Sequence, residues 1–453
     1  MEHFKKKPML GSGSEKLFGK IEKINDHKVK FFLNFYSGVL PQQLAQIAIY
    51  SKKYLDKYGW NGKDSYPNLA ESGPYGLGPY ILEEGYIEGD RSTPEVVLRA
   101  NPYYKGKDSA KVEKITIYTS LNLEDAKNSV ISNEGKLDIT PISFSSEVET
   151  ILSKYAKLII SPTTNSYAVH FNLINGSKAI KENKIRYAIN QAINNEILLN
   201  IAMMGEGSLT PTTISPHFYK MDKILDRLEP FLKKDQEKFK NINKNEYLKK
   251  IVIDYQTQNK MDINKPLDIK VLTSESFIFL MKEIKYFLEE ININLVIDIV
   301  QEENKIFKEL FATHKNKNEK EWDILIWANF DWFKHPYATM FVYFTNIAWS
   351  PIPFEPKLNS LINKLFIVDV ESDEYITLIS DIMKESYTNN YMLFLPNPNI
   401  VYAVNKEVVF HPRPSSFVPL WELEVTDFHW SLRGDKKYPE ELKKPYEVIR
   451  KNF

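Results

Sequence analysis

The pattern of hydrophobic and polar positions predicts alternating strands and helices in the second half of the chain. Leu267–Leu272, Asn294–Val300 and Trp322–Trp327 are short, mostly apolar stretches of strand length. Between them lie Phe277–Ile291 and Glu303–His314, in which apolar residues recur at helical spacing. This series predicts parallel strands joined by right-handed crossovers. The almost continuous apolar character of Trp322–Trp327 is typical of a strand that is buried on both faces of an α/β sheet.

Polar and aromatic residues follow Trp322–Trp327 directly and form the first candidate site. Asn329, Asp331 and Trp332 come next, and Pro336 prevents the strand from continuing. In open α/β sheets, ligands bind outside the carboxyl ends of the strands. The pattern therefore indicates a ligand site here, although an ordinary buried strand with a polar exit loop fits the spacing equally well.

Shorter elements are predicted elsewhere in the chain. The clearest helix is Asn183–Met204, which has one apolar face and is closed by Gly205; we interpret that face as core packing without chemistry. The other predicted helices are Val39–Leu55, Leu123–Asn133 and Asp369–Tyr387, and the predicted strands are Lys28–Leu33, Glu95–Ala100, Val112–Thr119, Leu137–Thr140, Asn165–Asn172, Tyr391–Phe394 and Ile400–Val404. Ile214–Lys265 is interpreted as helices with linkers, and Ser431–Phe453 as a charged tail or surface helix.

Composition narrows the class of protein. A length of 453 residues predicts two or three domains, and the balance of 59 basic and 59 acidic side chains gives no indication of a nucleic acid or an anionic membrane as partner. The absence of cysteine excludes disulfides, thiolate catalysis and cysteine-ligated zinc. No apolar run is long enough to span a membrane, and Met1–Phe18 lacks the apolar region of a signal peptide.

Local catalytic and metal-binding motifs are missing from the sequence. It contains no H-E-x-x-H, no G-x-S-x-G and no phosphate-binding loop, and no two histidines stand at metal-ligand spacing. We therefore expect no metal or cofactor, and an enzyme is the least favoured class. His170 lies alone in a predicted strand, where a satisfied core histidine is favoured over a ligand contact or catalyst.

Several segments together match one known series of motifs. They are Gly76–Tyr80 (GLGPY), Leu98–Gly106 (LRANPYYKG), Asn133–Thr140 (NEGKLDIT), Phe171-Asn172, Asn183–Asn195 (NKIRYAINQAINN) and the strand WDILIW. The chain resembles the extracellular solute-binding proteins, family 5, that serve peptide and nickel ABC importers. The similarity runs over residues 16–425, but the stretch 214–265 matches it poorly.

The resemblance implies a two-lobed periplasmic-binding-protein fold of type II (cluster C), in which mixed sheets with flanking helices enclose a ligand cleft between the lobes. It implies lobe 1 at residues 1–168, lobe 2 at 169–405, and a return to lobe 1 with a C-terminal tail at 406–453. The expected function is not enzymatic: the protein would bind a small peptide and deliver it to ABC permease subunits in the membrane. A monomer in the periplasm or at the cell surface is expected.

The resemblance also implies roles for individual residues. In peptide-binding members, an aspartate just after the tryptophan-containing strand holds the N-terminal amine of the peptide, and Asp331 is the match here, with Trp327 before it. Asn329, Trp332, Tyr80 and His170 complete the candidate ligand-binding set; no metal or cofactor is implied.

Two alternatives stay open. The same fold could bind an oligosaccharide, an opine or a nickel chelate, with Trp327, Trp332 and Trp349 stacking on a sugar. The chain could also be a truncated relic without transport function. In the family, a signal peptide and an early strand of lobe 1 precede the segment that matches Met1, so we expect lobe 1 to be incomplete at its N-terminus.

Overall fold

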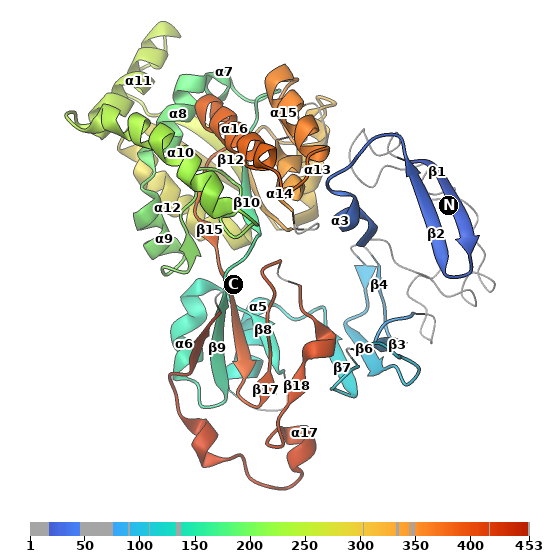
Figure 1. Cartoon of the computed structure of the whole chain (residues 1–453). Helices are drawn as coiled ribbons and strands as arrows, with labels where there is room; N and C mark the ends of the chain where they lie inside the picture. Colours follow the sequence, from blue (N-terminus) through green and yellow to red (C-terminus); the bar gives the residue numbers. More distant parts are fainter. Residues whose placement is uncertain are drawn as a thin grey trace.

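The computed structural model describes residues 18–45, 76–88, 91–107, 109–132, 137–301, 303–331, 335–343, 345, 349–415 and 417–451. Its two largest sheets have four strands each, and Figure 1 shows one in the upper and one in the lower part of the molecule. Helices surround the upper sheet on both sides, whereas the lower sheet carries fewer. The first strands of the chain lie to the right in this view.

The upper sheet contains the strands expected from the second half of the chain. Its order is β10 (Ser166–Phe171), β14 (Ile324–Asn329), β12 (Leu267–Ser274) and β13 (Ile293–Val300). As predicted, β12 runs parallel to both β13 and β14. β10 is antiparallel to β14 and pairs with it along its whole length.

The two faces of β14 enter two different hydrophobic cores. Leu325 and Trp327 pack into one core, and Ile324 and Ile326 pack into the other. The prediction of a strand buried on both faces is therefore confirmed. The helices of the first core are α10 (Met221–Gln236), α13 (Glu303–Thr313), α15 (Pro356–Phe366) and α16 (Asp373–Asn389), and those of the second are α8 (Asn183–Ala192), α9 (Asn195–Ala202), α11 (Lys244–Gln258) and α12 (Ile278–Glu289).

The single helix predicted over Asn183–Met204 is two helices in the structure. Ile193 has an extended backbone, with φ −74° and ψ 123°, and separates α8 from α9. The Asn194 side chain accepts hydrogen bonds from the backbone N–H groups of Glu196 and Ile197 and so caps a new helix. The sequence pattern does not indicate this break, because the apolar residues of α9 continue the spacing of those in α8.

The lower sheet has the order β19 (Val448–Arg450), β9 (Ala156–Ser161), β16 (Ile400–Asn405) and β8 (Ile139–Pro141). Helices α5 (Leu123–Ile131) and α6 (Glu147–Leu152) pack against it. The interpretation of 431–453 as a tail or surface helix is wrong for its end, because β19 pairs in parallel with β9. The predicted strand Tyr391–Phe394 is also wrong: only Met392 forms an isolated bridge, to His170.

The remaining elements are short or lie in small sheets. A three-stranded antiparallel sheet joins β3 (Tyr80–Glu84), β6 (Glu95–Ala100) and β7 (Lys114–Tyr118). Of the predicted helix Val39–Leu55, α3 (Leu40–Ala45) is described, and the rest lies outside the described residues. The other elements are β1 (Phe18–Asn25), β2 (Lys28–Leu33), β4 (Ile87–Glu88), β5 (Arg91–Ser92), α7 (Lys178–Lys181), β11 (Gly207–Ser208), α14 (Pro336–Thr339), β15 (Asn397–Pro398), β17 (Val408–Val409), β18 (Glu424–Val425), α17 (Trp430–Arg433), and the 3-10 turns Phe144–Ser146, Glu237–Phe239, Glu275–Phe277, Met340–Val342, Leu420–Glu422 and Glu440–Lys443.

The chain passes between the upper and lower halves at two described places. Residues 162–165 link β9 of the lower sheet to β10 of the upper one, and Asn399 links β15, which pairs with β11 in a small sheet, to β16 of the lower sheet. The predicted boundaries at 168/169 and 405/406 fall inside β10 and at the end of β16. None of the helices in the described part of the chain is both long and apolar enough to cross a membrane.

Candidate ligand-binding site

Asp331 lies two residues beyond the end of β14 and is buried, with 7% of its surface exposed. The Thr164 hydroxyl donates a hydrogen bond of 2.7 Å to its carboxylate, and the Asp331 backbone N–H donates one of 3.0 Å to Asn165 Oδ1. Thr164 and Asn165 belong to the crossing segment 162–165. The carboxylate is therefore held at the junction of the two sheets, where a charge-assisted hydrogen bond fixes its position.

Other chain segments are tied to the same crossing. The Thr164 backbone N–H donates to Pro414 O at 2.8 Å. The Thr163 carbonyl accepts hydrogen bonds of 2.8 Å from both Ser215 Oγ and Asn397 Nδ2. The junction is thus a buried polar region assembled from parts of the chain that are far apart in sequence.

Some buried polar atoms in this region make no hydrogen bond to another described residue. Ser166 Oγ, Ser274 Oγ and Asn397 Oδ1 are buried and make no hydrogen bond within the described part of the chain. Ser166 pairs with Asn329 at the end of β14, and Ser274 ends the parallel neighbour β12. Ser166 and Ser274 thus lie at the carboxyl edge of the upper sheet, and Asn397 is bonded to the crossing residue Thr163. Each buried polar atom without a partner costs about 1–3 kcal/mol, so their grouping calls for a bound partner such as water or a ligand.

His170 and Trp327 are brought together, but in the interior of the upper half. The Trp327 indole N–H donates a hydrogen bond of 2.8 Å to His170 Nε2. Trp327 also packs edge-on against Phe307, with ring centroids 5.3 Å apart, and lies 5.6 Å from Trp349. His170 has no exposed surface, and burial lowers its pKa from 6.5 to about 3. Its imidazole is therefore neutral, and because Nε2 is the acceptor, the proton sits on Nδ1.

The other predicted site residues are distributed as follows. Asn329 is buried at the last position of β14, two residues before Asp331. Tyr80 belongs to the β3–β6–β7 sheet, where its hydroxyl donates to Val112 O at 3.0 Å, so it lies in a different sheet from the other members of the set. Trp332 lies outside the described residues.

An ion pair across the same junction was not predicted. Arg450 in β19 contacts the Glu206 carboxylate at 2.6 Å, and Glu206, just before β11, is 4% exposed. Asn399 also donates a hydrogen bond to this carboxylate, at 3.2 Å. Burial, and secondly the charge of Glu206, raise the pKa of the nearby Glu147 to about 7. No local pattern signals this cluster, whereas the polar run Ser161–Ser166 between two apolar strands was a usable signal for the crossing.

Comparison with known proteins identifies the family of this chain. The family model "Bacterial extracellular solute-binding proteins, family 5 Middle" matches residues 3–350. Di/tripeptide-binding protein 3 of Pseudomonas aeruginosa (strain UCBPP-PA14) is 23% identical over 217 residues, which are 47% of this chain and 38% of that protein. The match thus spans less than half the length of this relative.

Solved structures share the fold. The periplasmic binding protein DppA from Helicobacter pylori in complex with the peptide STSA has a TM-score of 0.69 and 16% identity, covering 91% of this chain and 75% of that one. NikA from Staphylococcus aureus in complex with Ni(L-His)2 has a TM-score of 0.67 and 15% identity, with 90% and 79% covered. AgaA from A. tumefaciens R10 in complex with agropinic acid has a TM-score of 0.65 and 16% identity, with 90% and 78% covered.

These structures confirm the predicted type II periplasmic-binding-protein fold. The family model covers well over half of the chain. This protein therefore belongs to the bacterial extracellular solute-binding proteins, family 5, whose members bind solutes and are not enzymes.

Proposed function

We propose that this chain is the substrate-binding component of an ABC importer and that it holds a short peptide at the junction of its two halves. The observation that carries the proposal is the buried carboxylate of Asp331 at the carboxyl edge of the upper sheet, hydrogen-bonded to the crossing residue Thr164. Two similar proteins support the ligand class, since one is a di/tripeptide-binding protein and a structural neighbour holds the peptide STSA.

Asp331 suits the N-terminal amine of a peptide. A carboxylate paired with an ammonium forms a charge-assisted hydrogen bond about twice as strong as a neutral one. Because Asp331 is 7% exposed, such a hydrogen bond would form in a surrounding of low dielectric constant, where it is stronger than in water. The site would therefore favour ligands with a free amine.

The unpartnered polar atoms suit the rest of a peptide. Ser166 Oγ and Ser274 Oγ can donate or accept, and Asn397 Oδ1 can accept. An extended peptide offers backbone donors and acceptors in alternation, so it can satisfy such atoms without reading its side chains. In this proposal His170 and Trp327 support β14 from within the core, and Tyr80 lies outside the contact set.

The two halves would close around the ligand. We propose that the chain up to the crossing 162–165, together with the chain after Asn399, forms one lobe and that residues 166–398 form the other. Closure of the lobes would then give the signal for delivery to permease subunits in the membrane. The family is extracellular, and a periplasmic or cell-surface location is part of the proposal.

Binding of a defined peptide pool by calorimetry tests the proposal. We expect wild type to bind unmodified di- to tetrapeptides, and N-acetylation of the same peptides to weaken binding by about tenfold or more, because the cationic partner of Asp331 is lost. Asp331→Asn should have a similar effect on the unmodified peptides. Asp268→Asn, at an exposed position of β12, is the matched control and should bind as wild type does.

Equal binding of acetylated and free peptides by wild type, or unchanged peptide binding by Asp331→Asn, would contradict this function. A non-peptide ligand is the alternative, because neighbours holding a nickel chelate and an opine have TM-scores of 0.67 and 0.65, close to that of the peptide complex. In that case the same assay with opines or nickel–histidine complexes would give binding where the peptides give none.

A further inference from the structure

A cavity lies away from the junction, at the far end of the upper half of the molecule. It has a volume of about 690 Å³ and is formed by α8, α10, α11, the turn between α10 and α11, and the C-terminal end of α16. Figure 1 shows α11 at the end of the upper half farthest from the lower sheet. Its roof comes from the stretch 214–265, the part of the chain that matches the family pattern poorly. Its size is within the usual range for small-molecule sites.

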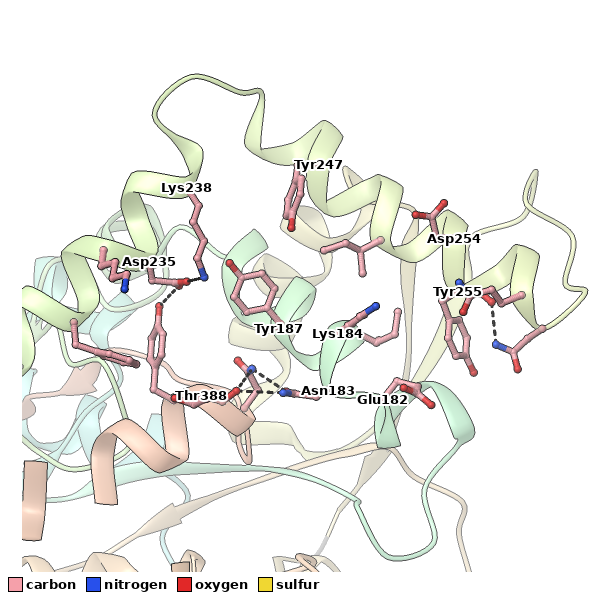
Figure 2. A pocket seen from close by; sticks show the side chains of 18 residues that line it. Glu182, Asn183, Lys184, Tyr187, Asp235, Lys238, Tyr247, Asp254, Tyr255 and Thr388 are labelled. Atoms are coloured by element: carbon pink, nitrogen blue, oxygen red, sulfur yellow. Dashed lines mark hydrogen bonds and ion pairs between the residues drawn. The ribbon is translucent and has the colours of Figure 1, made fainter. Parts of the chain in front are cut away.

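Tyrosine rings form much of the lining. Tyr187 rises from α8 and Tyr247 descends from α11 toward it, and Lys184 lies between Tyr187 and Tyr255 in Figure 2. Tyr247 is 45% exposed and packs edge-on against Phe239, with ring centroids 5.9 Å apart. Such rings offer flat apolar faces together with a hydroxyl group.

The charges of the lining balance one another. Three carboxylates and three lysines line the cavity: Glu182, Asp235, Asp254, Lys184, Lys234 and Lys238. An anionic ligand would meet the carboxylates and a cationic ligand would meet the lysines. A neutral ligand that can both donate and accept hydrogen bonds avoids either conflict.

One end of the cavity is a fixed hydrogen-bonding centre. The Asp235 side chain is 11% exposed; it pairs with Lys238 and accepts a hydrogen bond of 2.9 Å from the Tyr387 hydroxyl. Burial, and next the charge of Asp235, raise the pKa of both Tyr187 and Tyr387. These hydroxyls therefore stay protonated and act as neutral polar groups at all physiological pH values.

We propose that this cavity is a second ligand site and that it takes a neutral saccharide of one or two rings. The C–H faces of a sugar ring stack on tyrosine rings, and its hydroxyls donate to carboxylates and accept from ammonium and amide groups. The lining supplies each of these groups, with amides at Asn183, Gln258 and Asn259. The site is independent of Asp331 and of the peptide proposed at the junction.

The test is saturation-transfer NMR and calorimetry on the full chain with maltose, cellobiose and N,N′-diacetylchitobiose. We expect at least one of these sugars to bind, and Tyr247→Ala to weaken it by about tenfold, because one stacking face is removed. Tyr247→Phe keeps the ring and should retain most of the affinity. Asp331→Asn, which alters only the junction, should bind the sugar as wild type does.

Three results would overturn the proposal: no transfer to any of the three sugars, binding unchanged in both Tyr247→Ala and Tyr187→Ala, or binding lost in Asp331→Asn. The last would assign the sugar to the junction instead. Tyr247 is half-exposed, so its replacement leaves the core intact, and a thermal melt equal to that of wild type confirms this. Failure of peptide binding at the junction leaves these outcomes unaffected, so the two proposals are tested separately.

Discussion

Replacing His170 by glutamine should make the stability of the protein less sensitive to acid. His170 is fully buried in β10 and accepts the Trp327 indole hydrogen bond through Nε2. Protonation of the ring would break this bond and place a charge in the core. Glutamine can accept the same bond through its side-chain oxygen but takes up no proton between pH 5 and pH 8.

The size of the effect follows from the shifted pKa of His170. The pKa is lowered from 6.5 in the unfolded chain to about 3 in the folded one. In this interval the unfolded chain binds the extra proton, so the stability is complete above pH 6.5 and is lost as the pH falls. Between about pH 7.5 and about pH 5 the loss from this one group is about 2 kcal/mol. Burial lowers the pKa of His335 to about 4, so His335 adds a further loss of stability as the pH falls.

Urea denaturation of wild type and His170→Gln at about pH 7.5 and about pH 5 measures the difference. We expect the variant to lose about 2 kcal/mol less than wild type over this range, whatever its stability at neutral pH. The effect of His335 is common to both proteins and cancels in this comparison. His27→Gln, at an exposed position of the turn after β1, is the control and should behave like wild type. An acid sensitivity of His170→Gln equal to that of wild type would refute the reasoning.

Three further predictions concern the junction and the helix break. Burial raises the pKa of Glu147 from 4.5 to about 7, so the folded state loses stability as the pH rises from 4.5 to about 7. Glu147→Gln should therefore be more stable than wild type by about 1–2 kcal/mol at about pH 8.5, with no difference near pH 4. An unchanged urea midpoint at the higher pH would contradict this. Arg450→Ala removes the cationic partner of the buried Glu206 carboxylate and leaves the hydrogen bond from Asn399. We expect a loss of about 2 kcal/mol by urea denaturation, and a stability equal to that of wild type would show that the pair contributes nothing. Asn194→Ala removes the cap of α9 and should cost about 1 kcal/mol, whereas Asn194→Asp should keep most of the stability, as measured by thermal melting.

Elements that depend on local patterns could be predicted from the sequence. The strands β12, β13 and β14 were found because each is a compact apolar run, and their parallel arrangement followed from the helices between them. The break at Asn194 was missed because its cause is one side chain, which caps a helix without disturbing the apolar spacing. β19 was missed because its partner, β9, lies almost 300 residues earlier in the chain.

The same distinction explains how much of the junction was predictable. Asp331 could be placed at a sheet edge because it follows a recognisable strand. Its partners could not be assigned, since Thr164 is separated from it by 167 residues and the Thr164–Pro414 contact spans 250. Hydrogen bonds over such separations depend on how the two halves meet, and no window of sequence contains that information.

The packing of β14 affects both the stability of the upper half and the position of Asp331, the proposed ligand contact. Leu325 and Ile326 have no exposed surface and face different cores, so the two cores hold the strand from both sides and leave it little freedom to shift. Asp331 follows two residues after the strand ends and is tied to the crossing by Thr164. A carboxylate placed in this way is positioned before any ligand arrives, which reduces the entropy that binding must overcome. Loosening either core should therefore weaken ligand binding as well as stability, although no core residue contacts the ligand.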